Sequence, residues 1–336
     1  MKVMDIGEFG LIAHIAEIIK KRSSKTSYAW NHLCLGIGDD AAAWSTSRAI
    51  NLATTDIMIE EVHFDLKYTG WYDLGWKSIA SNLSDIAAMG GVPLYALVSL
   101  AFPGDVEVEN ITALYQGMVG VADNFQVVIS GGNISFSKQV IISITLLGKA
   151  AGNKLLTRAF ARQGDYVAIT GYPGLSAAGY EVLRKKLDIR PNARKIMLDT
   201  HLRPLPRINE ARILLKNGVR SAIDTSDGLV ADLTHICEAS RVSAAIYETN
   251  LPLHPFLNEY FPEKSLEFAL TGGEDYELLF TAGKAVMDRI KNRLSCPVTI
   301  IGEIMSGTPG EVKVFDKHGK SINLENKGWD HYRSRL

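Results

Sequence analysis

Residues 71–102 read WYDLGWKSIASNLSDIAAMGGVPLYALVSLAF, and this stretch predicts one helix followed by one strand. Apolar residues recur at helical spacing through Trp71–Met89, and Gly90, Gly91 and Pro93 then end that pattern. The apolar run Leu94–Phe102 is typical of a strand. A helix and a strand that follow one another so closely favour an α/β or α+β fold.

The same alternation extends to both sides of this stretch. In the first half it predicts helices over Leu11–Lys20 and Val108–Asn124 and strands over His32–Ile37, Ile50–Thr55, Gln126–Ser130 and Gln139–Leu147. A loop-like segment, Lys149–Gln163, separates the two halves. After it, the pattern predicts strands over Tyr166–Thr170, Ser221–Asp224, Val242–Tyr247, Tyr276–Thr281 and Val298–Ile304. It also predicts helices over Ala177–Lys186, Asn209–Lys216, Leu229–Ser240 and Ala285–Leu294, and a hairpin of Lys313–Asp316 with Ser321–Leu324. The 336 residues suit two domains, which we expect over 1–150 and 151–336.

The composition excludes several classes of partner. Lys plus Arg is 36 and Asp plus Glu is 37, so the net charge of −1 gives no reason to expect nucleic acid or an anionic membrane. No apolar stretch is long enough to span a bilayer. The cysteines, Cys34, Cys237 and Cys296, lie far apart and suit a reducing compartment. We therefore expect a cytoplasmic protein.

The common nucleotide-binding signatures are missing. No Gly-Lys pair has the upstream glycine and the following Ser or Thr of a Walker A loop. No Gly-x-Gly-x-x-Gly opens a helix after a strand. If the chain binds a nucleotide, it does so through a less common sequence motif.

Acidic residues recur beside glycines and at predicted strand ends. They are Asp39, Asp40, Asp56, Asp85, Asp224, Asp227, Glu274 and Asp275. Carboxylates suit Mg²⁺, which usually also takes waters and phosphate oxygens, and neighbouring glycines let the backbone approach a phosphate closely. Each motif also has a structural interpretation, because Asp and Gly favour turns and Asp227 could simply cap a helix. Several such motifs in one chain favour a metal and phosphate site.

The predicted helix Trp71–Met89 carries a polar stripe. Ser78, Ser81, Asn82 and Asp85 share one face, opposite the apolar residues. A solvated stripe would more typically carry Lys, Glu and Gln. Short polar side chains suit a face that a phosphate group or another backbone approaches closely.

Three further residues have two interpretations each. His63 follows two glutamates and could be a surface histidine. Arg158 could be a surface arginine or a phosphate clamp. Trp329 could anchor the tail or stack on a flat ring.

In order along the chain, these motifs resemble the thiamine-monophosphate kinase family. That family belongs to the superfamily of aminoimidazole ribonucleotide synthetase, selenophosphate synthetase and a hydrogenase maturation protein. The motifs are GEFGLI at 7–12, GIGDD at 36–40, TTD at 54–56, VHF at 62–64, GWK at 75–77, NLSD at 82–85, GGN at 131–133, SDGL at 226–229, GGEDY at 272–276 and GW at 328–329. The Gly-Asp-Asp and Asp-Gly motifs identify only the superfamily, whereas the GEF, VHF, GGEDY and closing GW motifs favour the thiamine branch.

The resemblance implies ATP-dependent phosphorylation of thiamine monophosphate to thiamine diphosphate, by direct transfer between two phosphates that several Mg²⁺ ions neutralise and align. It implies metal ligands at Asp40, Thr54, Thr55, Asp56, Asp85, Asn133, Asp224 and Asp227. It implies ATP contacts at Tyr115, Gly132, Asn133, Arg158 and Ser226, and substrate contacts at His63, Glu274 and Trp329. The resemblance implies an acidic residue where this chain has Asn133, which offers a carbonyl oxygen but no charge to that metal site.

The resemblance also implies a two-domain, synthetase-like α/β (α+β) fold. Two N-terminal sheets would pair into a barrel across a homodimer, with ATP near that interface. Two alternatives stay open. One is another ATP-dependent enzyme of the superfamily, such as selenophosphate synthetase, although this chain has no cysteine before Cys34. The other is a non-catalytic sensor of thiamine phosphate or nucleotide.

Overall fold

The structure is a computed structural model of the chain, and it describes residues 10, 12–13, 32–35, 37–46, 49–290, 293–324 and 328–330. The predicted helix Leu11–Lys20 and the motif at 7–12 lie almost wholly outside these residues. No helix in the described part of the chain is long and apolar enough to cross a membrane.

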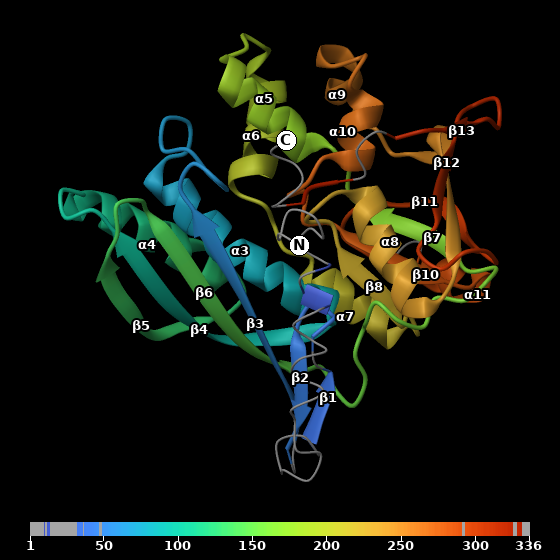
Figure 1. Cartoon of the computed structure of the whole chain (residues 1–336), viewed down its shortest axis with the longest axis horizontal. Coiled ribbons are helices and arrows are strands. Elements are labelled where there is room, and N and C mark those ends of the chain that lie inside the picture. Colours follow the sequence, from blue (N-terminus) through green and yellow to red (C-terminus); the bar gives the residue numbers. More distant parts are fainter. Residues whose placement is uncertain are drawn as a thin grey trace.

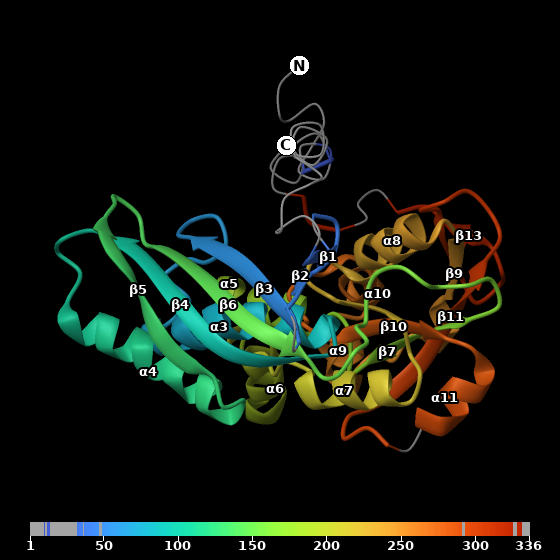
Figure 2. The ribbon, with the colours of Figure 1, turned by 90° about the horizontal axis from the view of Figure 1, so that it is seen from below.

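The first half forms a six-stranded sheet (Figure 1). Its strands are β1 (Leu33–Leu35), β2 (Ala42–Ser45), β3 (Ile50–Ile59), β4 (Gly91–Phe102), β5 (Val128–Phe136) and β6 (Ile141–Ala150), in the order β1-β2-β3-β6-β4-β5. Only β4 and β5 pair in parallel. Helices α3 (Trp71–Ala88) and α4 (Val108–Asn124) lie on one face (Figure 2), and the described helices leave the other face uncovered.

Two glycines allow α3 and α4 to cross closely. A Cβ on Gly75 would lie 1.9 Å from the carbonyl oxygen of Leu114, and one on Gly117 would lie 1.9 Å from that of Tyr72. Either substitution would push the helices apart, because each clash is with rigid backbone. This contact fixes α3 against the rest of its layer.

The second half forms a mixed seven-stranded sheet with the order β13-β12-β9-β11-β7-β10-β8. Its strands are β7 (Tyr166–Thr170), β8 (Ser221–Asp224), β9 (Ser243–Tyr247), β10 (Leu278–Ala282), β11 (Val298–Met305), β12 (Val312–Phe315) and β13 (Ser321–Ile322). Its helices are α5 (Leu175–Lys185), α6 (Pro191–Leu202), α7 (Ile208–Lys216), α8 (Leu229–Ser240), η1 (Glu248–Asn250), α9 (Pro255–Tyr260), α10 (Ser265–Thr271) and α11 (Lys284–Ile290). Helix α8 covers one face, and α7 and α11 cover the other (Figure 2).

Helix α3 lies at the junction of the two halves. It packs on β3, β4 and β6 of the first sheet and also contacts β8, α6 and α7 of the second half. One continuous apolar core includes Leu83 of α3, Leu146 of β6, Leu214 of α7 and Phe280 of β10. Side chains on α3 can therefore reach both halves of the molecule.

Most predicted elements are present, including the β12–β13 hairpin. Helices α6, α9 and α10 and strand β2 were not predicted. The strand expected over Gln126–Ser130 instead runs as β5 to Phe136, because Gly131 and Gly132 continue it rather than form a turn. The outer strands β1 and β5 do not pair, so the sheet of this single chain is open. The boundary near residue 150 stays a prediction.

Candidate functional site

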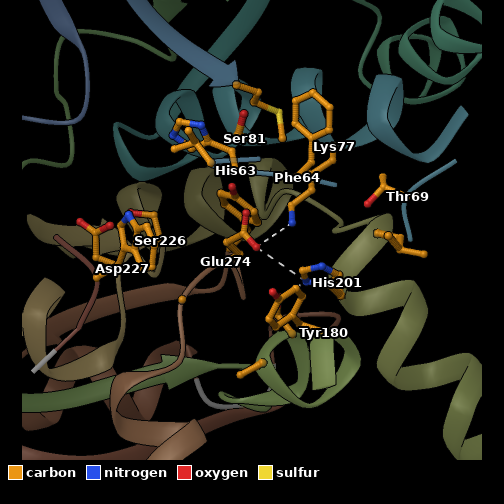
Figure 3. A pocket seen from close by; sticks show the side chains of 18 of the residues that line it. His63, Phe64, Thr69, Lys77, Ser81, Tyr180, His201, Ser226, Asp227 and Glu274 are labelled. Carbon is orange, nitrogen blue, oxygen red and sulfur yellow. Dashed lines mark hydrogen bonds and ion pairs between the residues drawn. The ribbon is translucent and has the colours of Figure 1, made fainter. Parts of the chain in front are cut away.

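A cavity of about 600 Å³ lies at the junction of the two halves. The end of β3, the segment 61–65 and α3 line it from the first half, and α5, α6, the end of β8 and the segment 271–276 line it from the second. Gly328 and Trp329 also line it. Figure 3 shows that the labelled side chains come from both halves. The cavity therefore unites motifs that are distant in sequence.

Three of the predicted aspartates form one cluster. Asp40, Asp85 and Asp224 each offer a carboxylate oxygen, and these oxygens lie within 4.8 Å of one another. Asp40 precedes β2, Asp85 is on α3 and Asp224 ends β8. Asp56 lines the same cavity, as does Ser81 of α3. Both halves of the molecule thus contribute carboxylates to one place.

The cluster favours a bound cation. Burial, together with repulsion from Asp56, Asp224 and Asp40, raises the pKa of Asp85 well above its ordinary value. Burial and repulsion from Asp40 raise the pKa of Asp224 to about 7. In the described part of the chain, Asp40 Oδ2 is buried without a hydrogen-bond partner. An oxygen-only donor set with mutual repulsion and an orphaned oxygen fits Mg²⁺.

Neighbouring side chains hold the carboxylates in place. Thr54 Oγ1 donates to Asp85 Oδ2 at 2.5 Å, and Ser84 Oγ donates to Asp224 Oδ2 at 2.6 Å. Arg158 Nη2 donates to Asp40 Oδ1 at 2.8 Å. The arginine predicted as a phosphate clamp is therefore paired with a carboxylate at the edge of the cluster in this structure.

The other end of the cavity is built around Glu274. Its Oε2 lies 2.7 Å from Lys77 Nζ and 3.7 Å from His201 Nδ1 (Figure 3). Burial opposes ionisation of Glu274, but the ammonium group of Lys77 outweighs it, so the pKa of Glu274 is lowered. Burial and Lys77 lower the pKa of His201 to about 3, so this imidazole is neutral at pH 7. His63 lines the same cavity, and its Nδ1 accepts a hydrogen bond of 3.0 Å from Ile59 N.

The start of α8 and the C-terminal tryptophan meet beside the cavity. Ser226 and Asp227 line it just before Gly228, where the free N–H groups of a helix begin. Trp329 N donates a hydrogen bond of 2.9 Å to Asp227 O, and 37% of Trp329 is exposed. Its backbone is anchored while its ring stays accessible at the wall of the cavity.

Four predicted residues lie apart from this cavity. Thr55 Oγ1 bonds Ile144 O on the uncovered face of the sheet, opposite to Thr54 and Asp56. The register places Asn133 beside Ser99 on that same face. Three strand spacings of about 4.8 Å separate β3 from β5, so Thr55 and Asn133 of one chain cannot share an ion. Tyr115 lies in a shallow groove on α4.

Gly132 also lies in β5, and its lack of a side chain has a local reason. A Cβ there would lie 1.8 Å from Val98 O of the neighbouring strand. Packing of β5 against β4 therefore requires glycine at this position, whether or not a nucleotide binds.

The polar stripe of α3 divides into two parts. Ser78 Oγ bonds Gly75 O and Asn82 Nδ2 bonds Ser78 O, so these buried side chains serve their own helix. Ser81 and Asp85 line the cavity. Lys77 and His201 were not predicted as site residues, and the only available signal was the lysine of the GWK motif, the one basic residue of the predicted helix Trp71–Met89.

Comparisons with known proteins match this chain over nearly its full length. The families described as AIR synthase related protein, N-terminal domain and C-terminal domain match residues 38–150 and 162–315. Thiamine-monophosphate kinase of Aquifex aeolicus is 36% identical over 336 residues, which cover 99% of this chain and 100% of that protein. The enzyme of that name from Bacillus subtilis is 35% identical over 89% of this chain and 94% of its own.

Solved structures match as well. One described as "AaThiL complexed with AMPPCP and TMP" has a TM-score of 0.84 at 35% identity and covers 98% of this chain and 99% of that one. One described as "Crystal structure of HypE-HypF complex" has a TM-score of 0.72 at 18% identity and covers 94% of this chain and 99% of that one, which shows a shared fold alone.

Proposed function

The chain belongs to the thiamine-monophosphate kinase family of AIR synthase related proteins, and from this premise we propose how it acts. It is a kinase that uses ATP to phosphorylate thiamine monophosphate to thiamine diphosphate. One observation carries the proposal for its active site. The cluster of Asp40, Asp85 and Asp224 adjoins the same cavity that Glu274 and Trp329 line.

We propose a direct in-line transfer. A phosphate oxygen of thiamine monophosphate attacks the γ-phosphorus of ATP, and the bond to the bridging oxygen of ADP breaks. The acceptor oxygen is already anionic, so no side-chain nucleophile and no strong base is required. The protein's task is to hold two anions in line within the cavity.

We propose Asp40, Asp56, Asp85 and Asp224 as the ligands of Mg²⁺, with Thr54 and Asp227 assisting. Several Mg²⁺ ions, when bound, would neutralise the phosphate oxygens and align donor with acceptor. The raised pKa of Asp85 and of Asp224 supports this assignment, because a cation would offset the burial and the mutual repulsion that cause it. Ser226 lies just before the start of α8, and Arg158 lies beside Asp40. From these positions both side chains can contact the phosphates of ATP.

We propose that the thiamine end of the substrate lies between Glu274, His63 and Trp329. The exposed indole of Trp329 suits stacking on a heteroaromatic ring, and the carboxylate of Glu274 suits an amino group or a positive charge. This arrangement points the substrate phosphate toward the aspartates.

We propose a homodimer in which the uncovered faces of two N-terminal sheets pair into a barrel. This face exposes Ile57, Tyr95, Leu97 and Val128, which are between 40% and 56% accessible in the single chain. Apolar residues gathered on one sheet face are typical of an interface. Thr55, Gly132 and Asn133 would then act near that interface, with ATP beside them, whereas Tyr115 on α4 would reach ATP only from the covered side of the sheet.

We propose a cytoplasmic location as well. Cys34, Cys237 and Cys296 are all free thiols, which supports a reducing compartment.

The test is formation of thiamine diphosphate and ADP from ATP, Mg²⁺ and thiamine monophosphate, with thiamine as the control acceptor. We expect ADP release only when the monophosphate is present, and we expect Asp85→Asn to abolish it while the protein stays folded. ADP release that ignores thiamine monophosphate would point to another enzyme of the superfamily. Binding of both ligands without turnover would instead indicate a sensor.

A further inference from the structure

Lys77 is a buried cation that the proposed transfer does not use. Only 4% of its side chain is exposed, and its Nζ lies 2.7 Å from Glu274 Oε2. A lysine so far from water requires a charged partner. Lys77 also lines the cavity that Asp85 and Asp224 of the acidic cluster line.

Lys77, Ser81 and Asp85 lie on one stripe of α3 and all line the cavity. Eight residues of helix separate Lys77 from Asp85, which amounts to about 12 Å. One rigid element thus carries the metal end of the cavity and supports its other end. That spacing suits a substrate with a phosphate at one end and rings at the other.

Glu274 sits on a backbone that is already fixed. Its φ of 64° lies in the left-handed region, and its N–H donates to Ser226 O at 2.8 Å. The next residue, Asp275, accepts hydrogen bonds from Gly174 N at 2.6 Å and Ser176 N at 2.9 Å. A non-glycine residue keeps such a conformation only where its surroundings enforce it, and this is common at functional sites.

In the described part of the chain, the ion pairs of the Glu274 side chain go to one of its two oxygens. Its Oε2 meets Lys77, with His201 Nδ1 at 3.7 Å. No described residue donates a hydrogen bond to Oε1, and one third of the side chain, 33%, is exposed. One oxygen is therefore fixed by the protein while the other remains available to a ligand.

We propose that Lys77 is a positioning residue that acts through Glu274. It keeps the carboxylate ionised and oriented, so that Oε1 binds the ring system of thiamine monophosphate, which offers an amino group and a positive charge. The inference rests on the proposed function and assigns a task to the lysine of the GWK motif.

A second ion pair on the same helix provides the matched control. Arg203 Nε lies 2.5 Å from Asp73 Oδ1 and also joins α3 to the segment after α6. Neither residue lines the cavity, and the Arg203 side chain is 47% exposed. If Lys77 only tied the two halves together, loss of Arg203 would have a comparable effect.

The experiment compares Lys77→Met, Lys77→Arg and Arg203→Met with the wild type. We expect Lys77→Met to raise the KM for thiamine monophosphate about tenfold or more, while the KM for ATP changes by less than about twofold. Lys77→Arg should recover most of the affinity, because it restores the charge. Arg203→Met should match the wild type.

A double-mutant cycle then tests whether Lys77 acts through Glu274. In the Glu274→Gln background, Lys77→Met should add little further loss. A full additional loss would overturn the inference, and so would an equal rise in both KM values or an Arg203→Met variant as impaired as Lys77→Met. If Lys77→Met does not fold, the double variant Lys77→Gln/Glu274→Gln replaces it, because it leaves neither charge of the pair without its partner. Its KM for thiamine monophosphate is then compared with that of Glu274→Gln alone.

Calorimetric binding of thiamine monophosphate separates the two proposals. If the wild type forms no thiamine diphosphate, the proposed function fails. The role of Lys77 is then judged by the dissociation constants alone. A higher Kd for thiamine monophosphate in Lys77→Met, but not in Arg203→Met, supports the role of Lys77. Equal Kd values in Lys77→Met and the wild type overturn it.

Discussion

Ser84 Oγ donates a hydrogen bond of 2.6 Å to Asp224 Oδ2 and so joins α3 to β8 at the acidic cluster. Ser84 precedes Asp85 in sequence, so one turn of α3 provides a carboxylate of the cluster and a donor to another carboxylate. The cluster is therefore assembled across the junction of the two halves. Its geometry depends on how α3 is held against the second sheet.

Loss of this bond should weaken metal binding more than it weakens the fold. We expect Ser84→Ala to raise the Mg²⁺ concentration for half-maximal turnover by about tenfold, because donors that orient metal ligands typically have effects of this size. Turnover at saturating Mg²⁺ should recover to near the wild-type rate. Titration of Mg²⁺ at fixed ATP measures this.

Ser78→Ala is the matched control for that variant. Ser78 is also buried on α3, but its hydroxyl bonds only Gly75 O of its own helix. An equal rise in the Mg²⁺ requirement of both variants would show that Ser84 matters only for packing.

Without metal, the stability of the protein should decrease as the pH rises. Burial and Asp40 raise the pKa of Asp224 from 3.8 to about 7 in the folded chain, and the pKa of Asp85 is raised well above 3.8. A carboxyl with a raised pKa stabilises the folded state below its unfolded value, and this stabilisation is lost as the pH passes through the folded value. The free energy of unfolding in EDTA should therefore decrease between pH 3.8 and about 7.

Asp224→Asn identifies the origin of this slope. The variant should show a shallower decrease than the wild type in denaturant titrations across that range. Asp275, whose pKa burial also raises to about 7, is present in both proteins, so the difference between the two curves reports Asp224. Mg²⁺ should flatten the wild-type curve but not that of the variant. Two parallel curves would contradict the assignment.

Much of the fold follows from local patterns. The predicted helix Trp71–Met89 matches α3 to within one residue, because its apolar periodicity is strong and glycines end it. Helix α6 was missed because its sequence, PNARKIMLDTHL, is mostly polar and only three of its residues are buried. The strand predicted over Gln126–Ser130 was too short, because Gly131 and Gly132 are typical of a turn but glycine also serves where two strands approach closely.

The site was predictable to the extent that its chemistry shows in sequence. Aspartates beside glycines predicted the cluster, since few structural roles need so many carboxylates. Lys77 and Glu274 are 197 residues apart, so no local pattern could pair them. Thr54 and Thr55 lie on opposite faces of the sheet, because successive side chains of a strand point to opposite faces. The sequence alone does not show that one face of β3 is covered and the other is not.

Charge on the uncovered sheet face should prevent the proposed dimer. Leu97 lies on β4, between β6 and the edge strand β5, and is 40% exposed in the single chain. We expect Leu97→Asp to yield a folded monomer by light scattering, with turnover reduced at least about a hundredfold, because a buried unpaired charge costs several kcal/mol. Leu205→Asp is the control, since Leu205 is 57% exposed between α6 and α7, away from that face. A dimeric, active Leu97→Asp would exclude the paired-sheet arrangement.

Asn133 is implied as a metal ligand by the resemblance, yet its side chain carries no charge. It lies on the uncovered face in the row of Ile57, Ser143 and Ser99, none of which is charged. An amide offers an ion one neutral oxygen, whereas a carboxylate adds a charge, and ligand charge raises affinity for hard cations. If this face meets ATP and Mg²⁺ in the dimer, Asn133→Asp should lower the Mg²⁺ concentration for half-maximal turnover by about threefold to tenfold.

Asn124→Asp, at the exposed end of α4, adds the same charge elsewhere and should have no effect. If the two variants respond alike, or if Asn133→Asp instead disrupts the dimer, Asn133 does not contact a metal ion.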